Sequence, residues 1–239
     1  MNTDRLATTS FAHRGLHGPQ TGLSENSLSA FNAAKDAGFG FELDILLSGD
    51  DKAIVIHDQN LKRLTGRDES ILNLTAEQLE KINFTDSNDT IPTLKIALNQ
   101  TAGKTPILIE IKGDQGEYNK IAKSVFQDIS DYNGPIAIMS FYPDIISYFK
   151  LNHPDITRGL VATPINDKSM PDDYFDIQQQ IKTIRDLEVD FIAYDIRALP
   201  NKATQYCQQN NITVLTWTVR SEADRQKAKI NTDNIIFEL

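Results

Sequence analysis

The second half of this 239-residue chain alternates regularly between short β-rich runs and helical stretches. The predicted β-rich runs there are 136–141, 158–163, 191–196, 213–219 and 234–239, and the predicted helices are 144–152, 173–187, 202–210 and 221–229. The first half adds β-rich runs at 10–13, 39–47 and 106–112, with helices at 28–37, 75–82, 92–102 and 118–132. Strands that alternate with helices pair in parallel, because each helix carries the chain back to the same edge of the sheet.

Eight β-rich runs remain once the return arm of a hairpin at 53–57 is set aside. Eight strands in this order are typical of an α/β fold, the (β/α)₈ TIM barrel. We therefore predict one TIM-barrel domain over 1–239, with a small insertion at about 59–92 after the second strand, over the barrel mouth. The last outer helix is missing from this pattern. Either a helix before the first strand or a partner subunit, as in a homo-oligomer, is expected to cover that edge.

The composition of the chain limits the kinds of partner that it can bind. The chain has 40% apolar and 24% charged residues and a net charge of −9, which argues against nucleic acid or an anionic membrane surface as the main partner. No apolar run reaches the length of a membrane span, so no stable membrane insertion is expected. The single cysteine, Cys207, cannot form an intrachain disulfide, and residues 1–10 lack the apolar core of a signal peptide. A cytoplasmic enzyme with a small-molecule substrate is the expectation.

One stretch of the first half, 39–58, carries unusual polar residues in an apolar setting. Glu42 and Asp44 are two residues apart on a predicted strand, so their side chains point to the same face. A turn at 48–51 then reverses the chain, and the antiparallel return brings His57 back beside Asp44. Two buried carboxylates need a cation, and hard divalent ions take such oxygen ligands. The alternative is an ordinary strand with solvent-facing acids and a capping Asp58.

These residues converge in the predicted fold. His13, Glu42, Asp44 and Glu110 all fall late in the first three strands, which are neighbours in the barrel. Active sites of such barrels lie at the carboxyl ends of the strands. The hairpin returns His57 to the same end. The predicted fold thus gathers three acids and two histidines at one rim.

Ordered sequence matches span nearly the whole chain. They are Ala12-His13-Arg14-Gly15, Glu25-Asn26-Ser27, Ala30-Phe31, Gly40-Phe41-Glu42-Leu43-Asp44, Val55-Ile56-His57-Asp58, Leu61, Arg63-Leu64-Thr65-Gly66, Ile91-Pro92-Thr93-Leu94, Glu110-Ile111-Lys112, Ser140-Phe141 and Trp217-Thr218-Val219. In this order they resemble the glycerophosphodiester phosphodiesterase family. The resemblance implies a metal-dependent barrel hydrolase of lipid and glycerol metabolism, which cleaves glycerophosphodiesters to glycerol 3-phosphate and an alcohol.

The resemblance also implies roles for single residues. It assigns a divalent ion, Ca²⁺ or Mg²⁺, to Glu42, Asp44 and Glu110, and acid–base catalysis to His13 and His57. Basic positions that would hold the phosphate match Arg14 and Lys112, although Glu110 and Lys112 could instead form a simple ion pair at the mouth. Trp217 is expected either to wall the substrate site or to fill the barrel. The nucleophile implied by the family is the neighbouring glycerol hydroxyl of the substrate.

Several expectations remain open in the sequence. The family usually has Pro where Ser24 stands, and it commonly ends the last strand with Thr-Asp followed by Pro, where this chain has Phe237-Glu238-Leu239. Alternative functions are a related phosphodiesterase for lysophospholipids or phosphoinositide-type head groups, or a non-catalytic barrel that binds a partner. Outside the matched motifs, His17 and His153 are predicted on the surface. Residues that could either reach the mouth or pack in the core are Phe141, Tyr142, Tyr194 and Asp195.

Overall fold

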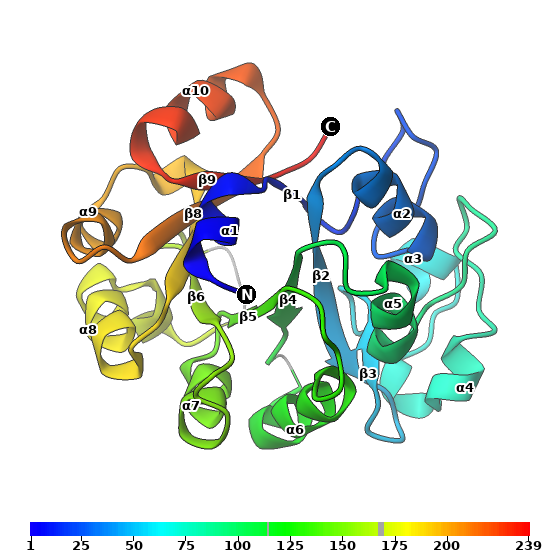
Figure 1. Cartoon of the computed structure of the whole chain (residues 1–239). Helices are drawn as coiled ribbons and strands as arrows, with labels where there is room; N and C mark the ends of the chain where they lie inside the picture. The colour runs from blue at the N-terminus through cyan, green and yellow to red at the C-terminus, as the bar shows by residue number, and fades with distance from the viewer. Residues whose placement is uncertain (114, 167–169) are drawn as a thin grey trace.

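The computed structural model describes residues 1–113, 115–166 and 170–239, and these form a closed barrel (Figure 1). Its nine-stranded sheet contains eight parallel strands and one antiparallel strand. The parallel strands are β1 (Phe11–Ala12), β2 (Gly40–Leu47), β4 (Ile107–Ile111), β5 (Ile136–Ser140), β6 (Arg158–Ala162), β7 (Phe191–Asp195), β8 (Thr213–Val219) and β9 (Asn234–Phe237). Strand β1 pairs with both β2 and β9 and so closes the barrel. The predicted TIM barrel is confirmed.

Helices cover the outside of the barrel. They are α2 (Leu28–Asp36), α5 (Leu94–Thr101), α6 (Tyr118–Ile129), α7 (Pro143–Asn152), α8 (Ile177–Leu187), α9 (Lys202–Gln209) and α10 (Glu222–Asn231). Side chains of Ser27, Thr93, Asn201 and Ser221 accept hydrogen bonds from the first turns of α2, α5, α9 and α10. Such caps satisfy N–H groups that have no partner inside the helix, so they fix where each helix begins.

The single helix predicted over 173–187 is wrong in one respect. The structure divides it into a 3₁₀ turn, η2 (Asp172–Phe175), and α8. Asp176 between them has an extended backbone, and its side chain accepts a hydrogen bond of 2.7 Å from the backbone N–H of Gln179. Asp176 therefore starts a new helix, because an aspartate that caps a helix lies outside the helical conformation.

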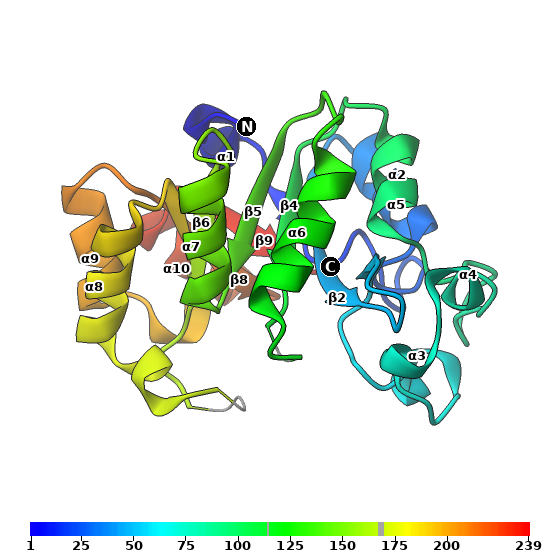
Figure 2. The same ribbon diagram turned by 90° about the horizontal axis from the view of Figure 1, so that it is seen from below.

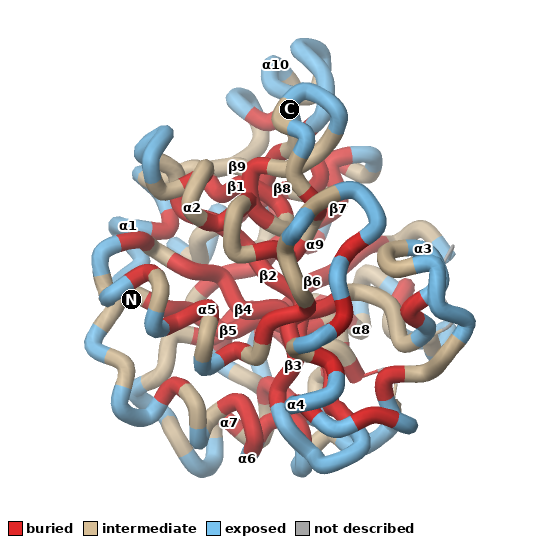
Figure 3. Tube along the Cα trace, turned by 90° about the vertical axis from the view of Figure 1, so that its right-hand side faces the viewer, coloured by how far each residue is buried: buried red, intermediate tan, exposed pale blue. Residues whose placement is uncertain are grey.

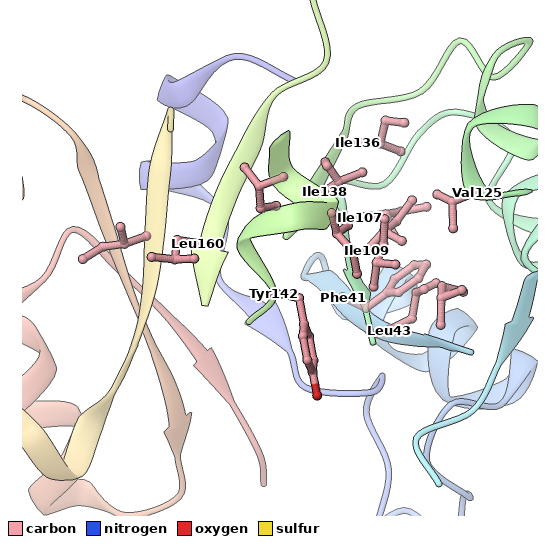
Figure 4. Close-up of a cluster of buried hydrophobic side chains, with 14 of the residues drawn as sticks. Phe41, Leu43, Ile107, Ile109, Val125, Ile136, Ile138, Tyr142 and Leu160 are labelled. Carbon is pink, nitrogen blue, oxygen red and sulfur yellow. The ribbon is translucent and has the colours of Figure 1, made fainter. Parts of the chain in front are cut away.

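Inward and outward side chains alternate along the strands and form two apolar layers. Leu108 on β4 belongs to a cluster inside the barrel, whereas its neighbours Ile107 and Ile109 pack in the outer cluster beneath the helices. Figure 4 shows part of the outer cluster around Phe41 and Leu43 of β2. The trace in Figure 3 is buried along most of the strands. With Phe41 and Leu43 facing outward, the intervening residues of β2 must face the barrel interior.

A short N-terminal helix, α1 (Thr3–Thr8), was not predicted from the sequence. Its Leu6 is fully buried among the inner residues, and Figure 1 shows the N-terminus over one opening of the barrel. The α1 helix therefore closes the bottom of the barrel. The outer face of β9 is covered from within the chain: the Phe237 ring contacts Phe39 at 5.0 Å, and the Arg225 guanidinium lies 5.4 Å from the Phe237 ring centre.

Segment 59–92 follows strand β3 (Ala53–Val55) and lies beside the barrel (Figures 1 and 2). It contains α3 (Lys62–Thr65), η1 (Ile71–Asn73) and α4 (Ala76–Leu79). Its apolar side chains form a separate cluster with Leu46, Ile54 and Ile56 of the β2–β3 hairpin. This arrangement places α3 at the rim of the barrel, next to the end of the hairpin.

Candidate active site

The parallel register of β2 and β4 brings the three predicted acids together. Asp44 of β2 lies opposite Glu110 of β4, and Glu42 is one inward-facing position earlier on β2. One carboxylate oxygen from each residue lies within 4.8 Å of the others. Glu42 and Asp44 are fully buried and Glu110 is 6% exposed. The alternative of solvent-facing acids on this strand is therefore wrong.

Two of these acids, Glu42 and Glu110, line a cavity of about 370 Å³ at the carboxyl ends of the strands. Its lining residues are His13, Arg14, Glu42, His57, Glu110, Lys112, Met139, Phe141, Asp195, Ile196, Arg197, Trp217, Thr218, Arg220, Asp224 and Ile236. All but one of the predicted site residues line the cavity. The exception, Asp44, contacts the lining residues Arg14 and Lys112. The structure thus gathers every predicted site residue at one place.

The two acids of β2 have different electrostatic surroundings. Burial raises the pKa of Glu42 well above its usual value, and the negative charges of Asp44 and Glu110 raise it further. Burial also opposes ionisation of Asp44, but Lys112 and Arg14 lower its pKa well below the usual value. The Glu42 oxygen Oε1 is buried without a hydrogen-bond partner among the described residues. The cations near this cluster therefore do not fully neutralise its carboxylates, and a further positive charge would stabilise the ionised form of Glu42.

Two cations lie against the acids. Lys112 Nζ is 2.8 Å from Asp44 Oδ1 and also contacts Glu110 Oε1, so the predicted Glu110–Lys112 ion pair is present. Arg14 Nε is 3.0 Å from Asp44 Oδ2. Burial would lower the pKa of Lys112, but Asp44 and Glu110 raise it above its usual value. Both cations stay charged, as a site for an anionic group requires.

The backbone at Arg14 depends on its neighbouring glycine. Arg14 and Gly15 both have positive φ angles, of 56° and 82°. A Cβ atom on Gly15 would lie 2.8 Å from the backbone carbon of Ala30 in α2. Glycine at this position permits both the conformation and the close approach of the loop to α2. The turn also directs the Arg14 N–H to Glu42 Oε2, at 2.9 Å.

His13 is held by the end of the last strand. Its Nδ1 is 2.6 Å from Glu238 Oε1, while its Nε2 faces the acids, 3.9 Å from Glu42 Oε2. Burial lowers the pKa of His13, and the hydrogen bond to Glu238 opposes this effect. Burial opposes ionisation of Glu238 too, but His13 and Arg220 lower its pKa to about 2. Glu238 is consequently a carboxylate at neutral pH.

His57 is held in a similar way. Its Nδ1 is 2.6 Å from Asp58 Oδ1, and Arg63 Nε of α3 is 2.5 Å from Asp58 Oδ2. The remaining guanidinium nitrogens of Arg63 bind both oxygens of Glu25, at 2.7 and 2.8 Å. Glu25 in turn accepts a hydrogen bond of 2.8 Å from Arg14. A continuous ion-pair chain therefore links His57 to Arg14 through the insertion.

Sequence reasoning gave no role to several residues that support the site. Asn26 donates to Asp44 Oδ2 at 2.9 Å and accepts from the Asp44 N–H at 3.2 Å. Glu25, Asp58 and Arg63 belong to the matched motifs, so the sequence points to these residues without indicating that they support His57 and Arg14. Glu238 lay at the departure from the family pattern, where no signal pointed to His13.

Two histidines are less exposed than predicted, and the alternatives left open for three aromatic residues are decided. His17 is half-buried rather than on the surface, and its Nε2 has no hydrogen-bond partner among the described residues. His153 is also half-buried, because its ring stacks on Phe126 at 3.3 Å. Tyr142 and Tyr194 pack in the core, whereas Phe141 reaches the cavity.

Trp217 combines both expected roles. It lines the cavity and also packs against the inner cluster of the barrel. Its Nε1 donates a hydrogen bond of 2.9 Å to the Ala193 carbonyl, and Phe141 meets its ring edge-on at 5.5 Å. Asp195, which also lines the cavity, is buried and pairs with Arg197. This side of the cavity is therefore an aromatic wall of Trp217 and Phe141 beside the Asp195–Arg197 ion pair.

The acid cluster fits a divalent metal ion. Three carboxylates supply the all-oxygen donor set that Ca²⁺ and Mg²⁺ prefer. The unpartnered Oε1 of Glu42 and the raised pKa of this residue show that the protein leaves negative charge uncompensated there. A second group, His13, His17 and Glu238, also has ligand atoms within 4.8 Å of one another. Both Glu238 oxygens there already accept hydrogen bonds from Arg220, whereas Glu42 of the acid cluster keeps an unpartnered oxygen, so the acid cluster is the better cation site.

Comparison with known proteins gives a consistent relationship. The model of the glycerophosphoryl diester phosphodiesterase family matches residues 13–238. The chain is 25% identical over 255 residues to a glycerophosphodiester phosphodiesterase of Caldanaerobacter subterraneus, covering 98% of this chain and 95% of that protein. It is 28% identical over 171 residues to bovine glycerophosphodiester phosphodiesterase 1, covering 67% of this chain and 50% of that protein.

Solved structures agree with the fold. An Oleispira antarctica phosphodiesterase, solved with its product sn-glycerol-3-phosphate, superposes with a TM-score of 0.82 at 19% identity, over 100% of this chain and 95% of that one. No helix among the described residues has both the length and the apolar character needed to cross a bilayer. The match from His13 to Glu238 confirms the resemblance and the expectation of an enzyme. This chain belongs to the glycerophosphoryl diester phosphodiesterase family.

Proposed function

We propose that the protein hydrolyses glycerophosphodiesters to glycerol 3-phosphate and an alcohol, with a divalent metal ion and two histidines as general acid and base. One observation carries this proposal: two carboxylates, two cations and two imidazoles line the same cavity, and the third carboxylate, that of Asp44, is buried against both cations. Each imidazole has its Nδ1 against a carboxylate, which leaves Nε2 for proton transfer. The Oleispira neighbour, which holds sn-glycerol-3-phosphate, supports the substrate class.

Arg14 and Lys112 would bind the phosphate. The planar guanidinium of Arg14 offers paired donors to two phosphate oxygens, while Lys112 adds a point charge. Both already lie against Asp44, so their positions are set before substrate enters. A divalent ion held by Glu42, Asp44 and Glu110 would supply charge neutralisation at the phosphoryl oxygens. All-oxygen ligands suit both Ca²⁺ and Mg²⁺.

Proton transfer would follow from the histidines. One neutral imidazole removes the proton of the glycerol hydroxyl next to the phosphate, whose oxygen then attacks phosphorus. The other, protonated, donates to the leaving alkoxide as the P–O bond breaks. Water then opens the resulting cyclic phosphate with the two roles exchanged. Trp217 and Phe141 would border the alcohol group.

The setting of the reaction is also a proposal. We propose a cytoplasmic location, supported by the single cysteine, Cys207, which is buried and free. The substrate is a small molecule. We also propose that the protein can form a homo-oligomer, which size-exclusion chromatography tests. Because the outer face of β9 is covered within the chain, no partner subunit is needed at that edge.

Product analysis on a panel of glycerophosphodiesters and lysophosphatidylcholine tests the function. We expect release of glycerol 3-phosphate from glycerophosphodiesters, and loss of turnover with a chelator, with His13→Ala or with His57→Ala. His153→Ala is the matched control, because His153 lies against Phe126 outside the cavity. Turnover of lysophosphatidylcholine alone would favour the lysophospholipid alternative. Folded protein that hydrolyses nothing with saturating metal would favour the non-catalytic barrel.

A further inference from the structure

The backbone holds Glu238 in a fixed position at the end of β9. The Glu238 N–H donates to the Val219 carbonyl of β8 at 3.0 Å. On the other side, the His13 N–H donates to the Phe237 carbonyl at 2.8 Å. Glu238 thus lies between β8 and the end of β1, and its carboxylate contacts His13, which follows β1. Its position is a consequence of barrel closure.

The Glu238 carboxylate is surrounded by donors. Oε1 is 2.6 Å from His13 Nδ1 and also accepts from Arg220 Nη2 at 2.8 Å. Oε2 accepts from Arg220 Nε at 2.7 Å. This fork of two parallel hydrogen bonds orients the carboxylate plane toward the histidine. The backbone N–H of Arg220 donates to Asp224 Oδ2 at 3.2 Å, which holds the main chain of Arg220 at the start of α10.

We propose that Glu238 is a positioning residue for His13, and that Arg220 orients Glu238. This proposal rests on the proposed function. The carboxylate keeps the proton of the neutral imidazole on Nδ1, so the lone pair is on Nε2, the nitrogen that faces Glu42. His13 then gains or loses a proton only at Nε2, while the Nδ1–H bond and the charge of Glu238 stay unchanged.

Only an acceptor can serve at this position. His13 and Arg220 together direct three N–H groups to the two oxygens of Glu238. An amide has one acceptor oxygen, and its NH₂ group would face either the guanidinium or Nδ1. If the NH₂ faces Nδ1, the imidazole must carry its proton on Nε2, where a general base needs a lone pair. Glu238→Gln therefore changes the proton position with almost no change in volume.

Steady-state kinetics on glycerophosphocholine provide the first test. We expect Glu238→Gln to lower kcat roughly 100-fold with KM within roughly twofold of wild type, because His13 acts on the transition state more than on binding. Glu238→Asp keeps the charge and should recover part of kcat. The matched control is Glu222→Gln on exposed α10, with wild-type kcat expected. Wild-type kcat in Glu238→Gln would overturn the proposal.

A spectroscopic test does not depend on turnover. In ¹⁵N-histidine NMR spectra above the pKa of His13, we expect the Nδ1–H tautomer in wild type and a shift toward Nε2–H in Glu238→Gln. An unchanged tautomer would overturn the proposal, even if no substrate is hydrolysed. If wild type shows no turnover but the tautomer shifts, the proposed function fails while the positioning role stands. If Glu238→Gln does not fold, Arg220→Gln gives the second variant, with a smaller shift expected and no shift contradicting it.

Discussion

Glu42 and Asp44 are both fully buried on the same face of β2, yet the structure raises the pKa of one and lowers that of the other. Asp44 lies between Lys112 and Arg14, at 2.8 and 3.0 Å. Glu42 has no such cation at its Oε1. The metal-free protein is therefore under electrostatic strain at Glu42, which a bound divalent ion would relieve.

Glu42→Gln should stabilise the metal-free protein while impairing catalysis. Folding raises the pKa of this carboxyl, so its ionisation costs more free energy in the folded state than in the unfolded state. The folded protein therefore loses stability as the pH rises above the pKa that the carboxyl has in the unfolded state. In chelator, the Tm of Glu42→Gln should therefore be higher than that of wild type. The difference in Tm should be larger at about pH 8 than at about pH 5. With saturating Ca²⁺ or Mg²⁺ the order should reverse. A wild type that is more stable in chelator at every pH would contradict the charge balance described here.

Arg63→Gln should reduce turnover although Arg63 lies outside the cavity. It holds Asp58 against His57 and Glu25 against Arg14. Loss of such a supporting contact commonly lowers activity by roughly 10- to 100-fold. Arg67→Gln is the matched control, because Arg67 is equally exposed in the same insertion and its guanidinium pairs with Glu69, outside the ion-pair chain. Equal kcat/KM for the two variants would show that the ion-pair chain is incidental.

Asp195→Asn should cost stability at neutral pH and little in acid. Burial opposes ionisation of Asp195, but hydrogen bonds from Arg197 and Thr163 lower its pKa. The stabilisation is present above the unfolded pKa of about 3.9 and is lost as pH falls through the lower folded value. Urea unfolding should show a deficit of about 1–3 kcal/mol at neutral pH that shrinks in acid. Asp186→Asn on the surface of α8 is the control, with no measurable deficit expected.

Gly15→Ala tests how far the Arg14 turn depends on a missing side chain. Gly15 and Gly38 have nearly equal φ angles, of 82° and 81°, but only at Gly15 would a Cβ meet another atom within 4 Å. Gly38→Ala should therefore cost about 1 kcal/mol for the left-handed backbone alone. Gly15→Ala should cost more and raise KM, because the loop and Arg14 must shift. Equal unfolding free energies and an unchanged KM would argue against this steric role.

Local patterns were enough to predict the strands and most helices. The parity of Glu42 and Asp44 on one strand places both on one face, whatever surrounds that strand. The turn at 48–51 and the short return likewise constrain His57 to lie near Asp44, and the structure pairs β2 with β3 in that register. The single helix predicted over 173–187 is wrong because the apolar spacing continues across Asp176. The side chain of Asp176 caps α8 there and so starts a new helix.

The sequence by itself determined the barrel, the inward face that carries the acids and the end of the barrel where the histidines gather. These follow from the period of two along strands and from the helices that force parallel pairing. Only the tertiary structure decided which cation compensates which acid, and which carboxylate orients each histidine. Glu238 and His13 are 225 residues apart in sequence. Barrel closure alone brings them together, because contacts between distant segments depend on how strands are arranged and leave no local periodicity in the chain.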